Sequence, residues 1–233
     1  MKAVVVGGAG TIGRRLVPAL RARGHEVVVA GRTSGDVHVD LTVHETIEAM
    51  YRDVTGIDAV VCVAAHGALD EFATLTVDAL HENMRAKFYG QADLVLTGQH
   101  HCAAGASFTL TSGIFADQAW PGGTGGGVIS GALHSFVLSA AVELPRAMRV
   151  NAVSPAMVSD SAAAFSAYFP GMRPVPMGDL VAHYLTCLEG DETGQVIRAY
   201  GQELRRPVRA GSRRRRAARC RWRSGPGRRR RTG

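Results

Sequence analysis

A short stretch near the start of the chain constrains the fold more than any other. Three consecutive valines (Val4–Val6) form a β-branched run that is typical of a buried strand, and Gly7, Gly10 and Gly13 follow before a helix-like segment begins at Arg14. Glycines at this spacing allow a sharp turn, a close approach of the backbone to a phosphate, and close packing of helix on strand. The first amides of the helix lack partners and attract an anion. The stretch therefore predicts a dinucleotide site, the alternative being a tight turn that binds nothing. The predicted phosphate contacts are Gly7, Gly10, Thr11, Ile12 and Gly13.

The end of the next predicted strand indicates which dinucleotide binds. An acidic residue there would bond a ribose 2′-hydroxyl and repel a 2′-phosphate. The chain instead has Arg32, Thr33 and Ser34, a guanidinium with two hydroxyls, which suits a phosphate. The pattern favours NADP(H) over NAD(H), although Asp36 could fold back toward the ribose and Arg32 could be a solvated loop residue.

Composition narrows the class of protein. A chain of 233 residues that is 46% hydrophobic fits one large α/β domain with a substantial core. No apolar run approaches the ~18 residues of a membrane span, and the first strand leaves no room for a signal peptide. The four cysteines are scattered, which favours neither a metal site nor a disulfide framework. We therefore expect a cytoplasmic protein without membrane association.

The net charge of +7 comes from one end of the chain. Fourteen of the 27 basic residues, and none of the 20 acidic ones, lie in residues 205–233, so residues 1–204 carry about seven excess negative charges. The tail has no apolar periodicity and is predicted to be disordered. It would bind polyanions in a salt-dependent way. We expect no specific nucleic-acid function, because Trp222 is its only aromatic residue; a frame-shifted or inert extension fits as well.

Predicted strands and helices alternate up to about residue 200. Strands are expected at 26–30, 37–40, 58–63, 107–112, 149–154 and 195–200, and later helices at 43–53, 76–99, 128–144 and 177–189. This order predicts a Rossmann-type doubly wound parallel sheet of about seven strands, flanked by helices in a single domain, residues 1–204. Residues 113–127 are expected to be a glycine-rich loop. Residues 156–176 read as an apolar lid, which indicates a small, largely apolar substrate.

In a parallel sheet the ligand crevice lies beyond the carboxyl ends of the strands. Ala64 and Ala65 follow the fourth predicted strand and are small enough to let a ribose and nicotinamide pass. Ser112 ends the fifth strand, and Pro155 closes the sixth on the same side. These positions predict a substrate site over the strand ends.

Taken together, the motifs resemble the short-chain dehydrogenase/reductase family from residue 2 to about 201. The matching stretches are Gly7-x-x-Gly10-x-x-Gly13, Asp40-Leu41, Val63-Ala64-Ala65, Ser112, Ala132-Leu133-x-x-Phe136, Ala141-Val142-Glu143-Leu144, Arg149-Val150-Asn151-x-Val153-Ser154-Pro155 and Thr193-Gly194-Gln195. The resemblance implies that Asp40 and Leu41 hold the adenine and that Ser112 is the catalytic serine. Ala64, Ala65, Pro155 and Val158 would contact the cofactor.

The family's catalytic Tyr-x-x-x-Lys pair is missing. Counting back from Ala132-Leu133 places the pair at Gly126 and Ser130, and counting forward from Ser112 places it at Gly125 and Ile129. Residues 113–167 contain neither Tyr nor Lys, so no shift of register restores it. A carbonyl oxygen that gains charge needs a proton or an electrophile, and loss of a positioned acid costs about 10²–10⁴-fold in rate.

Lys87 is the predicted replacement. It lies three residues before Gly90, where the family has the asparagine of its NxxG motif, and Lys2 is the only other lysine. A partly buried lysine has a lowered pKa and can serve as acid, base or electrostatic clamp; a solvated helix lysine is the alternative. His66 and His134 are further candidate acids. Ser130 could bond a ribose hydroxyl in place of the lost lysine.

Three functions remain open at this point. The first is an NADP(H)-dependent oxidoreductase acting on a carbonyl or hydroxyl with a non-standard proton donor. The second is a non-redox cyclase, dehydratase or isomerase, for which glycines 122–127 would enlarge the pocket. The third is an NADP(H)-sensing binding protein. The resemblance also implies a homodimer or tetramer, and an apolar stripe on one helix would suit that contact. The stripe consists of Leu133, Phe136, Val137, Ala140 and Leu144.

Overall fold

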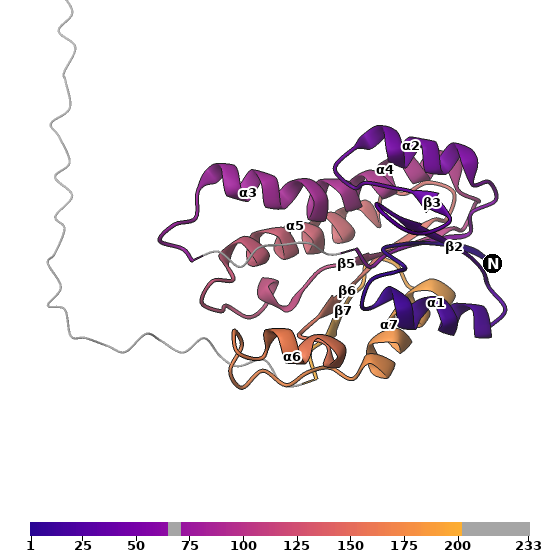
Figure 1. The fold of residues 1–233 in the computed structure, drawn as a ribbon. Coiled ribbons are helices and arrows are strands. Elements are labelled where there is room, and N and C mark those ends of the chain that lie inside the picture. The colour runs from indigo at the N-terminus through magenta and orange to yellow at the C-terminus, as the bar shows by residue number, and fades with distance from the viewer. Residues whose placement is uncertain (65–70, 202–233) are drawn as a thin grey trace, which may run out of the picture.

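A seven-stranded parallel sheet forms the centre of the molecule (Figure 1). The structure is a computed structural model that describes residues 1–64 and 71–201. The strands are β1 (Lys2–Val6), β2 (Glu26–Gly31), β3 (Val37–His38), β4 (Ala59–Cys62), β5 (Ser107–Thr111), β6 (Arg149–Pro155) and β7 (Val196–Ala199). Their order is β3-β2-β1-β4-β5-β6-β7, with every neighbouring pair parallel. The predicted doubly wound fold is confirmed.

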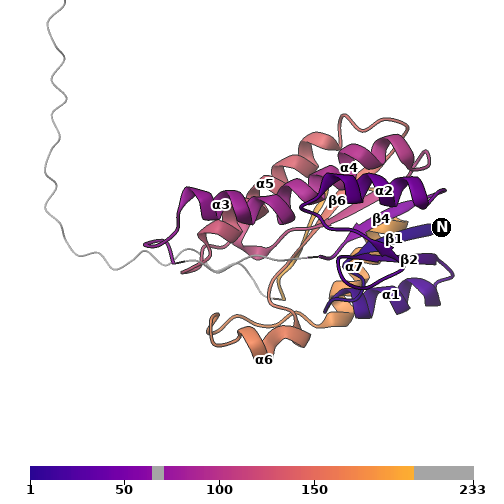
Figure 2. The ribbon, with the colours of Figure 1, turned by 45° about the horizontal axis from the view of Figure 1, so that its top comes forward.

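Helices cover both faces of the sheet (Figures 1 and 2). One face carries α1 (Gly13–Ala22), α6 (Ala162–Phe165) and α7 (Met177–Glu189). The other carries α2 (His44–Asp53), α3 (Val77–Met84), α4 (Gly90–His101) and α5 (Thr124–Ala140). Short helices η2 (Ile114–Ala116) and η3 (Ser159–Ser161) lie in the connections after β5 and β6.

The alternation of side chains along β1 explains its continuous apolar sequence. Ala3 and Val5 belong to the core on the α1 and α7 side, whereas Val4 and Val6 belong to the core on the α2, α4 and α5 side. All four are at most 1% exposed. A strand covered by helices on both faces needs apolar residues at every position.

The chain changes winding direction at β1, which places the crevice. β1 pairs with β2 on one side and with β4 on the other, and the chain winds outward in opposite directions from these two pairs. The connections leaving β1 and β4 therefore diverge at the carboxyl ends of the strands, where a doubly wound sheet binds its ligand.

Two predicted elements differ from the structure. The expected continuous helix 76–99 is broken between α3 and α4 by a π-helical turn, η1 (Arg85–Tyr89). The helix expected at 128–144 begins at Thr124 and ends at Ala140, so three glycines expected in a loop, at 125–127, lie in its first turns. Glycine disfavours helix by about 1 kcal/mol, and here close packing against Phe115 outweighs that preference.

Several predictions fall on residues outside the described part. These are Ala65, His66 and the tail, residues 205–233. Within residues 1–64 and 71–201, no helix is long and apolar enough to cross a membrane. The same residues contain no cluster of side chains suited to a metal ion.

Candidate active site

The glycine loop between β1 and α1 forms a cradle that no side chain could share. Gly7 has a φ of +85°, and a Cβ there would lie 2.6 Å from the backbone nitrogen of Ala64. A Cβ on Gly13 would lie 2.4 Å from the Gly7 carbonyl oxygen. The Gly10 amide donates to that same oxygen at 2.9 Å and closes the loop. The predicted tight turn and close helix–strand packing are therefore both present.

The cradle offers unpaired amides to an anion. In the described part of the chain, the amides of Thr11, Ile12 and Gly13 donate to no protein acceptor, and they lie at the positive end of α1. A hollow of about 400 Å³ lies beside this helix start. It is lined by Thr11, Arg14, Arg15 and Asp160. The free amides and the arginines fit the diphosphate of a dinucleotide.

One ion pair links this cradle to the segment after β6. The Arg15 side chain reaches Asp160 Oδ2 at 3.0 Å, and this contact lowers the pKa of the Asp160 carboxyl. Asp160 lies in η3, at the start of the predicted lid. The helix that follows the glycine cradle therefore also contacts the predicted lid.

The predicted 2′-phosphate contacts lie at the end of β2. Arg32, Thr33 and Ser34 are all exposed there and form a turn, in which a Cβ on Gly31 would meet the Ser34 carbonyl at 2.5 Å. The Asp36 carboxylate accepts the Val29 amide at 2.8 Å, so it is held on β2. The three polar side chains are thus open to solvent on the side where a ribose would lie.

The predicted adenine residues follow β3. Asp40 Oδ1 accepts hydrogen bonds from the amide and the hydroxyl of Thr42, at 2.9 and 2.7 Å, and these bonds lower the pKa of Asp40. The positive charge of Arg32 lowers the pKa of Asp40 further. The predicted 2′-phosphate contact therefore acts on the turn that holds the predicted adenine residues. Leu41 lies against α4 so closely that a Cβ on Gly90 would be 2.3 Å from its carbonyl oxygen.

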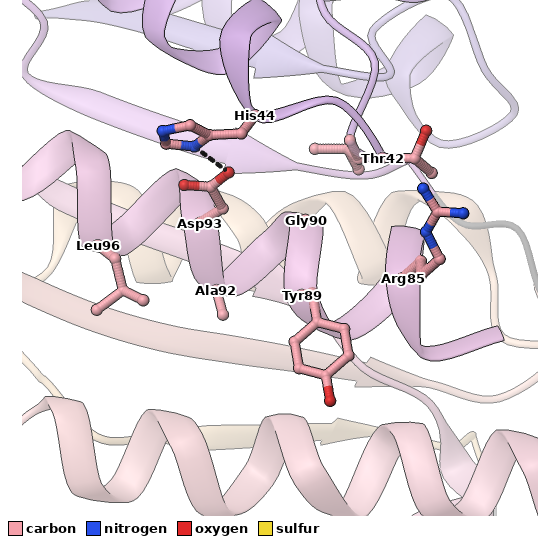
Figure 3. A pocket seen from close by; sticks show the side chains of 9 residues that line it. Thr42, His44, Arg85, Tyr89, Gly90, Ala92, Asp93 and Leu96 are labelled. Atoms are coloured by element: carbon pink, nitrogen blue, oxygen red, sulfur yellow. Dashed lines mark hydrogen bonds and ion pairs between the residues drawn. The ribbon is translucent and has the colours of Figure 1, made fainter. Parts of the chain in front are cut away.

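A second hollow of about 400 Å³ lies between this turn and α4 (Figure 3). His44 and Asp93 meet at 2.8 Å on one side of it, and the Arg85 side chain extends toward Thr42 on the other. The full lining is Leu41, Thr42, His44, Arg85, Tyr89, Gly90, Ala92, Asp93 and Leu96.

Ser112, Ser130 and Lys87 converge on one point of the crevice. The Ser112 hydroxyl donates to the Ser130 carbonyl oxygen at 3.3 Å. A Cβ placed on Gly113 would lie 3.3 Å from Ser130 Oγ and 3.9 Å from Lys87 Nζ. Ser130 Oγ is buried and has no partner among the described residues, so a buried polar atom is left for a water or a ligand. The structure thus brings Lys87 to the residue that follows Ser112.

The environment of Lys87 disfavours its charge. Burial lowers the pKa of the Lys87 ammonium, and no carboxylate of the described residues forms an ion pair with it. Among the described residues, the Cys62 thiol at the end of β4 is the titratable group that acts on the charge of Lys87, and burial raises the pKa of that thiol to about 12. Cys62 therefore stays neutral, and Lys87 can release a proton more readily than a solvated lysine.

The structure distinguishes the two possible registers of the missing pair. Ile129 is 2% exposed and packs in the core with Leu133, whereas Ser130 faces Gly113. This contrast favours the register that places the lost lysine at Ser130 and the lost tyrosine at Gly126. The Phe115 ring lies so close to Gly126 that a Cβ there would be 2.7 Å from Cδ2.

The expectation that glycines 122–127 enlarge the pocket is therefore wrong. Phe115 takes the space above Gly126 and is half-buried. Its ring centroid lies 5.5 Å from that of Phe169, which in turn lies 5.7 Å from that of Trp120. Trp120 Nε1 also donates to the Tyr168 carbonyl oxygen at 3.1 Å. This aromatic cluster, Phe115, Trp120 and Phe169, joins the segment after β5 to the predicted lid.

The other predicted residues have different surroundings. Pro155 ends β6 beside the crevice and is half-buried, whereas Val158 is 6% exposed and pairs with Val175 within the lid. His134 lies near Asp117 and Arg198, and burial lowers the pKa of its imidazole. Its position on the side of β7 separates it from Ser112.

Sequence reasoning missed two residues that shape the site. Phe115 was not considered because its contact with Gly126 is set by the fold of the loop. Gln91 is fully buried and bonds both Lys87 and Thr111. The sequence did contain one signal for this role, because Gln91 lies four residues after Lys87 and next to Gly90.

Comparisons with known proteins bear on the fold and on the family. Residues 4–175 match the family model described as "Enoyl-(Acyl carrier protein) reductase". A curated relative, carbonyl reductase [NADPH] 2 of Sus scrofa, is 28% identical over 176 residues, which cover 68% of this chain and 72% of the relative. The solved structure of the protein lin1944 from Listeria innocua is 34% identical, with a TM-score of 0.83 over 86% of this chain and 100% of that one. A small-chain dehydrogenase in complex with NADPH has a TM-score of 0.76 at 23% identity, covering 86% of this chain and 97% of that one.

Proposed function

Because the chain belongs to the short-chain dehydrogenase/reductase family, we propose that it is an NADP(H)-dependent oxidoreductase with Lys87 as its proton donor. The substrate is a small, largely apolar carbonyl compound or the corresponding alcohol. The convergence of Lys87 and Ser130 on the residue after Ser112 is the observation that supports this function. Its relatives are named as a carbonyl reductase and a dehydrogenase bound to NADPH.

The cofactor is assigned to NADP(H) on local chemistry. The amides of the glycine cradle suit the diphosphate, and Arg32, Thr33 and Ser34 suit a 2′-phosphate. Asp40 and Leu41 border the adenine, and Ala64, Pro155 and Val158 border the crevice. When bound, NADP(H) supplies or accepts the hydride.

The chain's own residues handle the oxygen of the substrate. Ser112 exchanges its hydrogen bond to the Ser130 carbonyl for one to the substrate's carbonyl oxygen, whose position it fixes. The Lys87 ammonium transfers a proton to that oxygen as negative charge develops on it, and the neutral amine accepts the proton in the reverse direction. Ser130 Oγ, which lacks a protein partner, is placed to hold a ribose hydroxyl or a water that relays the proton.

Two other features support an apolar substrate and a redox reaction. The aromatic cluster of Phe115, Trp120 and Phe169 presents an apolar wall next to the crevice. The non-redox alternative depended on an enlarged pocket, and Phe115 removes that reason for it. Nothing in the described residues favours the NADP(H)-sensing alternative over turnover.

We also propose that the chain acts as a homo-oligomer. Leu133 and Val137 are fully buried in the core, so these two members of the predicted stripe do not reach the surface. Exposed apolar side chains lie at Tyr89, the last residue of η1, at Leu96 on α4 and at Leu138 on α5, and each is more than half exposed. Analytical ultracentrifugation of the wild type and of the Leu96→Asp variant tests this contact.

The catalytic proposal is tested with variants of Lys87. Oxidation of NADPH at 340 nm is followed with a panel of apolar aldehydes and ketones. Lys87→Met should lower kcat/KM by about 10²–10⁴-fold while leaving the Kd for NADPH within a few-fold. Lys2→Met, at a surface lysine that pairs with Glu26, is the control. Full turnover by Lys87→Met would refute the role of Lys87, and binding of NADPH without turnover of any carbonyl would refute the function.

A further inference from the structure

Gln91 is a fully buried polar residue on the first turn of α4. Its carboxamide makes three hydrogen bonds with two other residues. Oε1 accepts the Thr111 amide at 2.8 Å, and Nε2 donates to the Thr111 carbonyl at 3.0 Å and to the Lys87 carbonyl at 2.6 Å. A side chain that satisfies this many buried backbone groups fixes them relative to one another.

The bonds to Thr111 replace a missing part of the sheet. β4 pairs with β5 only as far as Val61 and Thr109, and the chain then turns toward β1, where Val63 donates to the Val6 carbonyl. The backbone of Thr111 would be left without a neighbour on that side. Gln91 supplies one donor and one acceptor, as the next residue of β4 would have done.

The bond to Lys87 depends on the π-helical turn η1. The Gly90 amide donates to the Arg85 carbonyl, five residues back, in place of the usual four. This pairing shifts the backbone of the turn, and the Lys87 carbonyl accepts the Gln91 side chain. Gln91 therefore connects the backbone of Lys87 to the residue that precedes Ser112.

We propose that Gln91 is a positioning residue that holds Lys87 over Gly113, beside Ser112. The inference rests on the proposed function, because it assigns a task to Gln91 in presenting the proton donor. The geometry supplies the reason: one carboxamide bonds the backbone of both Lys87 and Thr111, and the Lys87 amine lies 3.9 Å from where a Cβ on Gly113, two residues after Thr111, would stand.

The proposal has a measurable electrostatic consequence. Cys62, at the end of β4, is the titratable group of the described residues that acts on the charge of Lys87, and the amine lies 3.9 Å from where a Cβ on Gly113 would stand. When Gln91 no longer holds the turn, the amine can move toward solvent. The midpoint of its titration should then rise toward that of an ordinary lysine.

The test uses two variants of Gln91 and a control on the same helix. Gln91→Glu keeps the shape but turns a carboxylate oxygen toward two carbonyls, and Gln91→Met removes all three bonds. Both should lower kcat tenfold or more, leave the Kd for NADPH within about threefold, and move the pH midpoint of kcat upward. Gln99→Leu, at a glutamine whose side chain bonds, among the described residues, only the Leu96 carbonyl of its own turn, should change none of these quantities.

A second measurement does not depend on turnover. The rate of Lys87 labelling by trinitrobenzene sulfonate is followed by mass spectrometry as a function of pH, for the wild type and both variants. An upward shift of the labelling midpoint supports the proposal even if Lys87→Met proves active, which would refute only the catalytic role. A folded Gln91 variant with unchanged labelling and pH profiles would overturn it.

Discussion

Replacing Gly126 with alanine tests whether Phe115 occupies the position of the missing tyrosine. The new Cβ would lie 2.7 Å from Phe115 Cδ2, whereas ordinary contacts begin near 3.4 Å, so the ring must retreat by about 0.7 Å. The ring is held on its other side by Phe169. Overpacking of this kind costs about 1–3 kcal/mol, and the gain in helix propensity returns about 1 kcal/mol.

The net expectation for Gly126→Ala is a destabilisation of about 0–2 kcal/mol. Gly131→Ala is the matched control, because Gly131 lies on the same helix and a Cβ there meets nothing within 4 Å. This control should stabilise the fold by about 1 kcal/mol. The two variants should therefore differ by about 1–3 kcal/mol in the free energy of unfolding, with a Tm difference of about 2–4 °C for each kcal/mol.

Urea unfolding followed by circular dichroism measures both variants at equal protein concentration. The double variant Phe115→Ala, Gly126→Ala should recover most of the destabilisation assigned to the clash, beyond the sum of the single effects. If Gly126→Ala stabilises the protein as much as Gly131→Ala does, the space above Gly126 is free. The missing tyrosine would then have left a pocket, contrary to the geometry described here.

Three further substitutions test the cofactor half and the buried lysine. Gly13→Ala places a Cβ 2.4 Å from three backbone atoms of Gly7 and Gly8, so NADPH binding measured by calorimetry should be lost; binding within tenfold of the wild type would contradict the cradle. Arg32→Ala should weaken the binding of NADPH by about 10–100-fold, which corresponds to the ~1.5–3 kcal/mol of a charged hydrogen bond, and should leave the binding of NADH unchanged. Equal losses of affinity for both cofactors would contradict the assignment of NADP(H). Because burial lowers the pKa of Lys87, the unfolded chain binds more protons between the folded and ordinary pKa values, so the free energy of unfolding should rise with pH in that window. Lys87→Met should lose this rise in urea titrations across alkaline pH, and an unchanged slope would show that Lys87 is solvated.

The features that could be predicted from the sequence are local ones. Gly7, Gly10 and Gly13 determine the cradle through their own spacing, and apolar runs bounded by turn residues mark strands wherever the sheet falls. Lys87 could be singled out because a single lysine stood three residues before Gly90. Each inference needed only neighbours along the chain, and each element lies where it was expected to within a few residues.

The features that could not be predicted depend on contacts between distant segments. Gln91 bonds Thr111, twenty residues away, and no periodicity within α4 indicates that bond. The early start of α5 depends on how Phe115 packs against bare glycine backbone. The residues Arg85–Tyr89 carry no compositional signature of a π-helical turn. The turn is stabilised instead by the hydrogen bond that the Lys87 carbonyl accepts from the Gln91 side chain.

The loss of the Tyr–Lys pair and the placement of Lys87 are two parts of one rearrangement. Where the family has tyrosine and lysine on the first turns of a helix, this chain has Gly126 and Ser130, and Phe115 closes over the first of them. Ser130 is too short to reach across the crevice, and its hydroxyl has no partner in the described part of the chain. Lys87 approaches the same point from the opposite side, on a turn of different pitch. In the family the cation beside the catalytic serine comes from the helix that carries Ser130 in this chain. Here Lys87, on η1, supplies the cation near Ser112 instead. Restoring tyrosine at Gly126 alone should not restore the family's chemistry, since Phe115 already fills the space next to Gly126.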